Sequence, residues 1–311
     1  MQSRINKSVT VALGLTSVLA MHSPWAAPAT MQAVVASKGN ISVQTQPVPE
    51  PAAGQVRIKV YSVGVNPVDY KTVERRATAA DFIPGYDSAG VVDALGSGVT
   101  GLKVGDAVMG WTRNLGTYAE YVVIPAETAI PKAANVSFAD ASAIPHAGYT
   151  AWNLAVVIGE VASGKKVLIL GGSGGVGAFA IQIAKNKGAY VIATASTRNQ
   201  EFMKSLGADE VIDYTKEKFE DKLKNINVVI NTVDVDNANG AVKVLKKGGI
   251  LASVGGLPEG TACADAGVRC ENRNQSGTTA HDAMTQMMQW AGEGKFKVNI
   301  ESNLCRLDGD Q

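Results

Sequence analysis

The sequence is poor in several residue types, and each scarcity narrows the classes of protein that it can encode. Only three of its 311 residues are cysteines, too few for a disulfide framework or a zinc cluster. Cys263 and Cys270 can pair in an oxidising compartment, and unpaired thiols in a loop are an equal alternative. Charged residues make up 18% of the chain and the net charge is +1, so we predict no nucleic-acid partner.

Acidic residues are also missing around the most informative motif. The β-branched run Lys166-Val-Leu-Ile-Leu170 predicts a buried strand, and an apolar, helix-patterned segment begins shortly after it. Between them, Gly172, Gly174 and Gly177 have the G-x-G-x-x-G spacing. In that motif the glycines allow a tight turn, the close approach of backbone to a pyrophosphate and the packing of helix on strand. We therefore predict a dinucleotide-binding loop made of Gly172, Ser173, Gly174, Gly175, Val176 and Gly177.

The missing acid indicates which dinucleotide is bound. An NAD site places a carboxylate about 20 residues after the loop, where it binds the ribose 2′-hydroxyl. Here the second predicted strand ends at Ala195, and the next acidic residue after the loop is Glu201. Ser196 and Arg198 instead provide a hydroxyl and a cation suited to a 2′-phosphate. We predict NADPH as the cofactor.

The same loop contains a second motif. Gly171-x-Ser173-x-Gly175 matches the nucleophile elbow of serine hydrolases, which also lies between a strand and a helix. A hydrolase would need an acid and a histidine downstream, and His281 is the only histidine after the loop. The elbow does not require Gly172 or Gly177, so we favour the nucleotide site and keep a Ser173 hydrolase as an alternative.

The chain divides into two parts with different patterns of expected strands and helices. From Met31 to about Ile144 the pattern is all-β, with short strands between Pro and Gly signals, and a helical stretch from 138 to 157 leads out of it. From Gly164, strands alternate with helices, which indicates an α/β domain with a doubly wound parallel sheet. The expected strands are 166–170, 190–195, 210–213, 228–233 and 249–254, and the expected helices are 176–187, 198–206, 215–224 and 237–247. We expect an irregular segment at 261–280 and a Met-rich core helix at 283–291.

Several motifs outside the glycine loop point to one family: Gly64-Val-Asn-Pro-Val-Asp-Tyr-Lys71, Pro84-Gly-Tyr-Asp-Ser-Ala-Gly-Val-Val92, Gly116-Thr-Tyr-Ala-Glu-Tyr121 and Ser205-Leu-Gly-Ala-Asp-Glu-Val-Ile-Asp-Tyr214. With them the chain resembles the medium-chain dehydrogenase/reductase superfamily, in its zinc-free quinone oxidoreductase branch. That branch includes NADPH-dependent alkenal/one and quinone oxidoreductases. The resemblance covers 31 to 257 and implies a GroES-like domain at 30–150 and a Rossmann domain at 151–285. Relatives continue past the segment 286–311, so it resembles a truncated C-terminal return.

The resemblance implies further cofactor contacts. Thr150 matches a position near the nicotinamide, Tyr214 matches a position beside the 2′-phosphate, and Val254 and Gly255 match the stretch that borders the nicotinamide. Tyr214-x-x-x-Lys218 also has the spacing of the short-chain reductase pair, but in that family the glycine loop opens the chain. Because relatives commonly dimerise, the resemblance leaves a homodimer open.

The same comparison supplies candidate catalytic residues. Zinc alcohol dehydrogenases have a Cys where Asn66 stands and a His-Glu pair where Tyr86 and Asp87 stand, so we predict no metal. The implied activity is NADPH-dependent reduction of an activated C=C in enals, enones or quinones. Without a metal, hydrogen-bond donors must stabilise the enolate oxygen, and a proton must reach the α-carbon. We assign these roles to Asn66, Tyr70 and Lys71, with water as an alternative proton donor. A catalytically weak NADP-binding relative is the alternative function.

The first 29 residues resemble a secretory signal peptide. Arg4 and Lys7 form a basic start, an uncharged apolar run follows, and Ala27-Pro-Ala29 has the pattern of a cleavage site. The apolar run is too short for a stable membrane span. Cleavage would make the protein periplasmic, whereas a start at Met31 would leave it in the cytoplasm, where NADPH is available. An exported NADPH enzyme would have to cross with its cofactor already bound, yet the segment has no twin-arginine motif.

Overall fold

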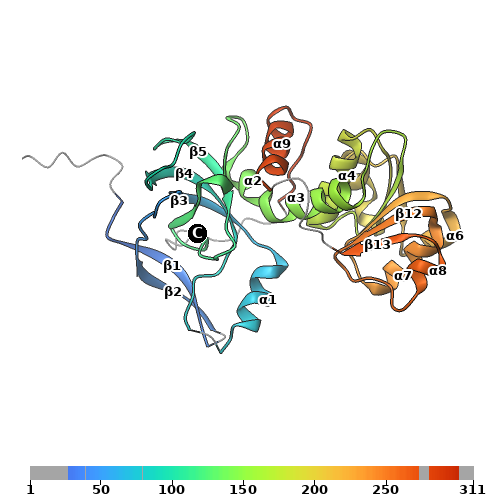
Figure 1. The fold of residues 1–311 in the computed structure, drawn as a ribbon, viewed down its shortest axis with the longest axis horizontal. Helices are drawn as coiled ribbons and strands as arrows, with labels where there is room; N and C mark the ends of the chain where they lie inside the picture. Colours follow the sequence, from blue (N-terminus) through green and yellow to red (C-terminus); the bar gives the residue numbers. More distant parts are fainter. Residues whose placement is uncertain (1–26, 39, 79, 273–279, 301–311) are drawn as a thin grey trace, which may run out of the picture.

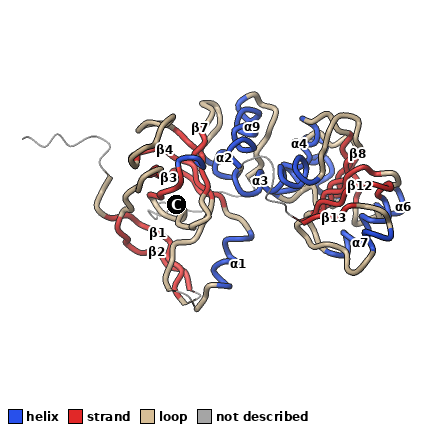
Figure 2. The backbone as a smooth tube through the Cα atoms, in the orientation of Figure 1, coloured by secondary structure: helices blue, strands red, loops and turns tan. Residues whose placement is uncertain are grey.

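The computed structural model describes residues 27–38, 40–78, 80–272 and 280–300, and these form two lobes (Figure 1). Strands dominate the first lobe, and helices surround the sheet of the second (Figure 2). Residues 1–26 of the predicted signal segment and residues 301–311 lie outside the described residues. In the described part of the chain, no helix is long and apolar enough to cross a membrane.

The first lobe is a five-stranded antiparallel sheet with a hairpin beside it. Its order is β6-β3-β4-β5-β7, and its core is aliphatic, with Val56, Ile58 and Ile124 fully buried. The hairpin joins it through bridges from Ala33 to Ala119 and from Ala36 to Phe82. This arrangement confirms the predicted β-rich first domain. The strands are β1 (Thr30–Ser37), β2 (Asn40–Pro47), β3 (Gln55–Gly64), β4 (Asp87–Leu95), β5 (Ala107–Trp111), β6 (Tyr121–Pro125) and β7 (Ala129–Pro131).

One helix interrupts this lobe, so the prediction of an all-β pattern there was wrong for residues 67–75. Helix α1 (Pro67–Arg75) has proline in its first turn, where a missing N–H costs nothing. Asp69 accepts the N–H of Asn66 at 2.6 Å, which satisfies a donor that the helix leaves free. These signals are local, but the short helix has no long apolar stripe that sequence reasoning detects easily.

The second lobe contains a six-stranded parallel sheet, which confirms the doubly wound fold. Its order is β10-β9-β8-β11-β12-β13. Strand β8 therefore lies at the centre, with β9 and β10 added on one side of it and β11, β12 and β13 on the other. This is the strand order of dinucleotide-binding sheets. The strands are β8 (Lys166–Leu170), β9 (Tyr190–Ala195), β10 (Glu210–Asp213), β11 (Ile226–Asn231), β12 (Leu245–Ser253) and β13 (Arg269–Asn272).

Helices cover both faces of this sheet. Alternate residues of β8 point to opposite sides, so Val167 and Ile169 belong to one core and Leu168 and Leu170 to the other. The second lobe has α4 (Gly175–Asn186), η3 (Thr197–Asn199), α5 (Gln200–Ser205), α6 (Phe219–Lys222), α7 (Val235–Val244) and α8 (Ala262–Asp265). Helix α6 is shorter than predicted, because Asp213 holds the N–H groups of Thr215 and Lys216 in a turn.

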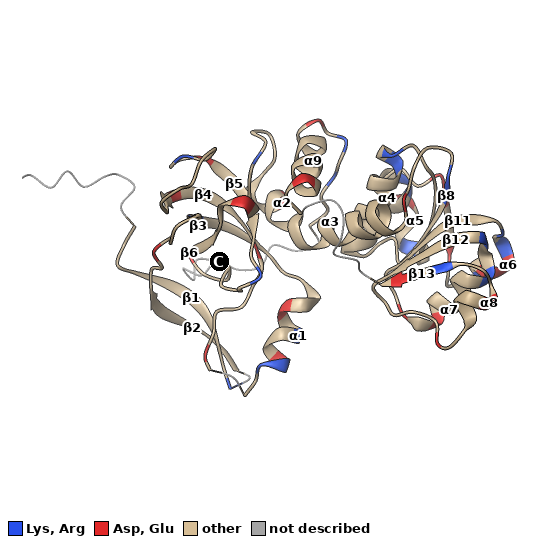
Figure 3. Ribbon diagram, viewed as in Figure 1, with Lys and Arg blue, Asp and Glu red and all other residues tan. Residues whose placement is uncertain are grey.

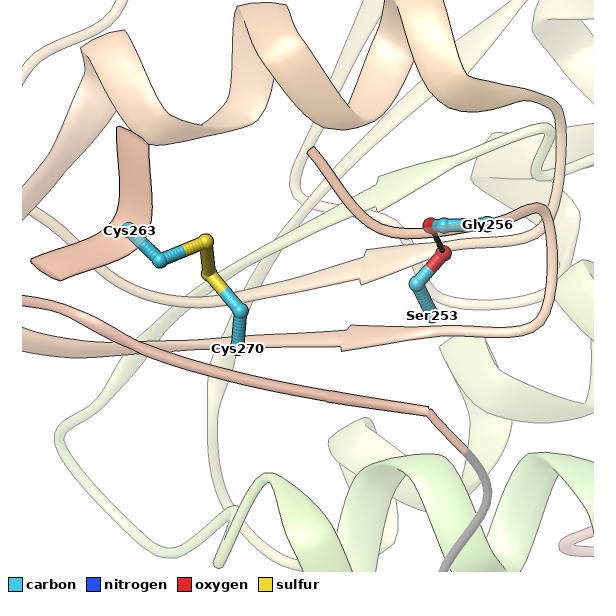
Figure 4. Close-up of a disulfide and its surroundings, with 4 residues drawn as sticks. All are labelled: Ser253, Gly256, Cys263 and Cys270. Atoms are coloured by element: carbon cyan, nitrogen blue, oxygen red, sulfur yellow. Dashed lines mark hydrogen bonds between the residues drawn. A yellow bond between two sulfur atoms is a disulfide. The ribbon is translucent and has the colours of Figure 1, made fainter. Parts of the chain in front are cut away.

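The segment 261–280 was predicted to be irregular, and this was wrong for α8 and β13. Strand β13 has only four residues, all polar or half-buried, so it lacks the alternation that identifies a strand. Its register comes from pairing with β12, where Leu251 lies opposite Cys270. A disulfide between Cys263 and Cys270, with Cα atoms 6.1 Å apart, ties α8 to this edge strand (Figure 4).

A helical layer joins the lobes (Figure 1). It contains α2 (Phe138–Ala143), α3 (Pro145–Trp152), the π-helical segment η2 (Asn153–Ile158) and α9 (Ala280–Gly292). The predicted helical stretch at 138–157 is confirmed, and the predicted domain boundary at 150 falls inside α3. Helix α9 is the Met-rich helix, and Met284 and Met287 are fully buried. A Cβ at Gly148 would lie 3.0 Å from the sulfur of Met287, so α9 packs closely on α3 and the methionines fill core space as predicted.

Candidate cofactor and active site

The glycine loop leaves the carboxyl end of β8 and is fixed by hydroxyls from the two neighbouring strands. The N–H of Gly171 donates to Thr194 Oγ1 at 3.2 Å, and the N–H of Gly172 donates to the carbonyl of Thr194 at 3.0 Å. From the other side, Thr232 Oγ1 donates to the carbonyl of Leu170 at 2.8 Å. Sequence reasoning missed both threonines, although a polar residue at the end of a buried apolar strand is a detectable signal. These bonds hold the turn in place before any ligand binds.

Each motif glycine has a distinct steric environment. A Cβ at Gly177 would lie 2.9 Å from the Gly172 Cα, so this glycine allows α4 to pack against the turn. A Cβ at Gly172 would lie 2.8 Å from the sulfur of Met203. At Gly174 the nearest atom would be 3.5 Å away, and this glycine is exposed. Gly174 is therefore the position at which a ligand can approach the backbone.

Helix α4 begins at this exposed glycine. Gly174 is its N-cap and provides no side chain to accept the free N–H groups of the first turn. The positive end of the helix dipole lies at the same place, which suits a pyrophosphate. Helix α3 approaches the loop, since a Cβ at Gly175 would lie 3.8 Å from the Cβ of Ala147. On α3, Thr150 Oγ1 donates to the carbonyl of His146 at 2.8 Å, so its hydroxyl is partly engaged within its own helix.

The carboxyl end of β9 presents the residues predicted to select the cofactor. Ala195 is fully buried, Ser196 is half-buried and Arg198 is exposed, and Arg198 has no ion pair with any residue that the structure describes. Tyr214, at the end of the adjacent β10, is 61% exposed. The structure thus brings together Ser196, Arg198 and Tyr214 at one edge of the sheet.

Asp213, the last residue of β10, is a carboxylate at this edge of the sheet, because it is paired with Ala195 of β9. Its Oδ1 accepts the N–H and the hydroxyl of Thr215, and its Oδ2 accepts the hydroxyl of Thr197. These hydrogen bonds hold the pKa of Asp213 well below its usual range. The carboxylate is therefore charged and occupied by its own loop, which leaves the cationic Arg198 as the free charged group.

A buried polar network lies at the ends of β11 and β12. Asn231 Nδ2 donates to Ser253 Oγ at 3.1 Å and to the carbonyl of Asp234 at 2.8 Å. Val254, the residue after β12, donates its N–H to the carbonyl of Asn231 at 3.0 Å. A Cβ at Gly255 would lie 2.7 Å from the Val233 backbone, so two turns meet closely here. Val254 and Gly255 therefore lie at the same sheet edge as the glycine loop, and sequence reasoning missed the network that fixes them.

The candidate catalytic residues lie on and just before α1 in the other lobe. Asn66 is half-buried, and its Nδ2 donates to Asp87 Oδ2 at 2.9 Å. Tyr70 is 55% exposed, and Lys71 is exposed. Neither side chain forms a hydrogen bond or an ion pair within the described residues, so both can meet a ligand.

Asp87 is the main feature that sequence reasoning missed. It is completely buried, and burial raises its pKa to about 8. Its Oδ2 accepts from Asn66 and from the N–H of His146 at 3.0 Å, while its Oδ1 has no partner. Burial also raises the pKa of Asp69 and, together with the charge of Asp69, the pKa of Tyr118. The signal in the sequence was an acid at the first position of the buried strand β4.

Two alternatives can be compared with this geometry. Within the described residues, no group of three His, Cys, Asp or Glu is placed to hold a metal ion. His281, the only histidine after the glycine loop, lies with its Nδ1 2.7 Å from the carbonyl oxygen of Glu127. That contact gives no support to a Ser173–His281 pair.

Family models match both lobes. Residues 52–134 match the alcohol dehydrogenase GroES-like domain, and residues 175–293 match the zinc-binding dehydrogenase family. A GroES-like lobe followed by a dinucleotide sheet is the domain arrangement of a class of NAD(P)H-dependent oxidoreductases. The chain belongs to the medium-chain dehydrogenase/reductase superfamily, in its quinone oxidoreductase branch, as the resemblance implied.

Individual relatives agree with this assignment. The 2-methylene-furan-3-one reductase of Solanum lycopersicum is 42% identical over 223 residues, which are 67% of this chain and 57% of the relative. The chloroplastic NADPH-dependent alkenal/one oxidoreductase of Arabidopsis thaliana is 40% identical with the same coverage. The chain thus spans 57% of the length of these two relatives. The solved quinone oxidoreductase of Coxiella burnetii is 32% identical and has a TM-score of 0.78, covering 88% of this chain and 90% of that one.

Proposed function

We propose that this protein is an NADPH-dependent reductase of the activated C=C bond in enals, enones or quinones, and that it acts without zinc. The single observation that carries the proposal is the carboxyl edge of the second sheet. There an exposed Gly174 precedes a helix N-terminus, Ala195 stands where NAD sites have a carboxylate, and Arg198 follows it without an ion pair to any described residue. The activities for which the relatives are named support the substrate class, and Asn66 and Tyr86 at the zinc-ligand positions support the absence of zinc.

The residues of this chain fit the cofactor along the whole edge. Residues 172–177 would hold the pyrophosphate, Ser196, Arg198 and Tyr214 the 2′-phosphate, and Thr150, Val254 and Gly255 the nicotinamide end. When bound, NADPH supplies the hydride. Asn66, held in place by Asp87, would orient the substrate carbonyl or the nicotinamide ribose. Tyr70 or Lys71 would donate a hydrogen bond to the developing enolate oxygen and pass a proton toward the α-carbon.

Isotope transfer tests this proposal directly. NADPH deuterated at the nicotinamide C4 is mixed with an α,β-unsaturated ketone, and NMR of the product locates the deuterium. We expect it at the β-carbon, with a solvent proton at the α-carbon. Tyr70→Phe and Lys71→Ala should each lower kcat/KM for the ketone while leaving NADPH affinity unchanged. NADPH binding without transfer would instead identify a catalytically weak relative, and unchanged kcat/KM in both variants would remove these two roles.

We also propose that the protein works in the periplasm after loss of its first 29 residues. The Cys263–Cys270 disulfide supports this location, since disulfides persist in oxidising compartments. Cell fractionation with mass spectrometry of the N-terminus tests it. Periplasmic protein that starts near residue 30 with both thiols oxidised is expected, and cytoplasmic protein that starts at Met1 or Met31 would contradict it.

A further inference from the structure

A pocket of about 420 Å³ lies beside α1 and is lined by residues of the first lobe. The C-terminal half of α1 and the segment that follows β5 both contribute to it. A second pocket of about 380 Å³ shares part of this lining. The residues around the first pocket are Thr72, Arg75, Arg76, Tyr86, Arg113 and Asn114, with Leu115.

The pocket shares α1 with the candidate catalytic residues, since its lining residue Thr72 follows Lys71. Tyr86 lines it and lies 3.1 Å, hydroxyl to hydroxyl, from Thr72 on α1. The next residue, Asp87, accepts the amide of Asn66, where α1 begins. A substrate that reaches Asn66 therefore has this pocket as the neighbouring space for its remaining groups.

The charge of the pocket is unbalanced. Its lining includes three arginines and no carboxylate. The basic C-terminal end of α1 is visible in Figure 3, in a molecule whose charges are otherwise mixed. Among the described residues, Arg76 and Arg113 form no ion pair, and the only acid of the second pocket, Asp81, does not pair with Arg76. Like charges around one hollow repel each other, so an anion that enters it lowers the electrostatic energy.

Aromatic rings hold two of these guanidinium groups. Arg76 lies over Phe82, 4.5 Å from the ring centroid, and Arg113 lies over Trp111 at 5.5 Å. Stacking on a ring restricts the guanidinium plane and leaves its N–H edge free. Arg75 differs, because it donates to the carbonyl of Lys71 and to Thr72 Oγ1, both at 3.1 Å. Arg76 and Arg113 are thus the two cations available to a ligand.

We propose that this pocket binds a carboxylate carried by the substrate, and that Arg76 and Arg113 determine specificity for it. Guanidinium groups bind carboxylates through two parallel N–H···O bonds, so a carboxylate between them is preferred over a neutral group. The inference rests on the proposed function and narrows its substrates to enones or quinones with a carboxylate remote from the reacting C=C bond.

The test compares one unsaturated ketone that carries a terminal carboxylate with its primary amide, which has nearly the same shape and no charge. We expect wild-type kcat/KM for the acid to exceed that for the amide by about tenfold, as for a charge-assisted hydrogen bond. Arg76→Gln and Arg113→Gln should each remove most of this preference through KM, and leave the amide and NADPH affinities unchanged. Lys59→Gln, which removes an exposed cation of β3, is the matched control and should retain the preference.

Calorimetric binding of both ligands to the NADPH-loaded protein separates this inference from the proposed function. Tighter binding of the acid that disappears in Arg76→Gln and Arg113→Gln supports the pocket even where neither ligand is reduced. Reduction of both ligands at equal kcat/KM overturns the pocket and leaves the reductase in place. The pocket is also overturned if the wild-type protein binds the acid and the amide with equal affinity or does not bind the acid. The same holds if the variants lose affinity for the acid and the amide equally.

Discussion

Two alanine substitutions in the glycine loop separate folding from cofactor binding. A Cβ added at Gly177 would lie 2.9 Å from both Gly171 C and Gly172 Cα, and closer still to the Gly171 oxygen. These are backbone atoms, so α4 must shift away from β8, and overpacking of this kind costs roughly 1–3 kcal/mol of stability. Gly177→Ala should lower the melting temperature by several degrees, at roughly 2–4 °C per kcal/mol.

Gly174→Ala should behave in the opposite way. Gly174 has φ −76° and ψ 164°, a conformation that alanine adopts without strain. Alanine restricts the unfolded chain, which stabilises by about 0.4–1 kcal/mol, and it is a poorer N-cap by a similar amount, so the two effects offset each other. The added methyl group covers the surface where we expect the pyrophosphate. Affinity for NADPH should fall about tenfold or more, equivalent to about 1.4 kcal/mol.

Thermal unfolding of the cofactor-free proteins and fluorescence titration with NADPH measure the two effects separately. We expect Gly174→Ala to melt like the wild type and bind NADPH weakly, whereas Gly177→Ala melts earlier. Wild-type NADPH affinity in Gly174→Ala would refute the assignment of the loop. Wild-type stability in Gly177→Ala would refute the packing role of the third glycine.

Three further predictions follow from other parts of the structure. Arg198→Gln should raise the KM for NADPH about tenfold and leave the KM for NADH unchanged, because only NADPH has the 2′-phosphate. Steady-state kinetics with both cofactors test this prediction. Burial raises the pKa of Asp87 to about 8, so the folded chain keeps a proton that the unfolded chain loses above about pH 4. The free energy of unfolding should therefore fall as the pH rises from about 4 to 8, by at most about 1.4 kcal/mol per pH unit. Urea titrations of Asp87→Asn should show a flatter pH dependence. The wild-type slope in this variant would contradict the assignment. Cys263→Ser opens a short loop and should cost about 2 kcal/mol in the oxidised protein and almost nothing in dithiothreitol, as urea unfolding will show.

The sequence predicted the parts of the fold that depend on local patterns. Strands β8, β9 and β10 have the predicted limits. The first two are short, largely apolar runs bounded by turn residues, and β10 has two apolar residues between two acids. The steric role of Gly177 was also predictable, since one glycine of the motif must allow the helix to pack on the strand. Strand β12 begins at Leu245, earlier than predicted. The prediction missed its first residues because they are exposed, include two lysines and show no apolar alternation.

The parts that the sequence did not predict depend on contacts between distant segments. Asp87 is unusual because it is completely buried, and the segments that surround it include Asn66 before α1 and His146 on α3. The pairing of β13 depends on β12, and the arginine pocket forms only when α1 packs against the segment after β5. Periodicity and motif spacing do not report contacts between distant segments. A buried acid or a cluster of cations from several segments is therefore recognised only in the three-dimensional structure.

The central claim, that the second lobe binds NADPH for the reduction of an activated C=C bond, is tested most directly by following cofactor oxidation. NADPH and NADH are compared at equal concentration against a panel of enals, enones and quinones. We predict oxidation of NADPH that depends on the acceptor, with a kcat/KM for NADPH at least tenfold above that for NADH. Equal use of the two cofactors would contradict the assignment of Ser196 and Arg198, and the absence of oxidation with every acceptor would contradict the proposed reaction.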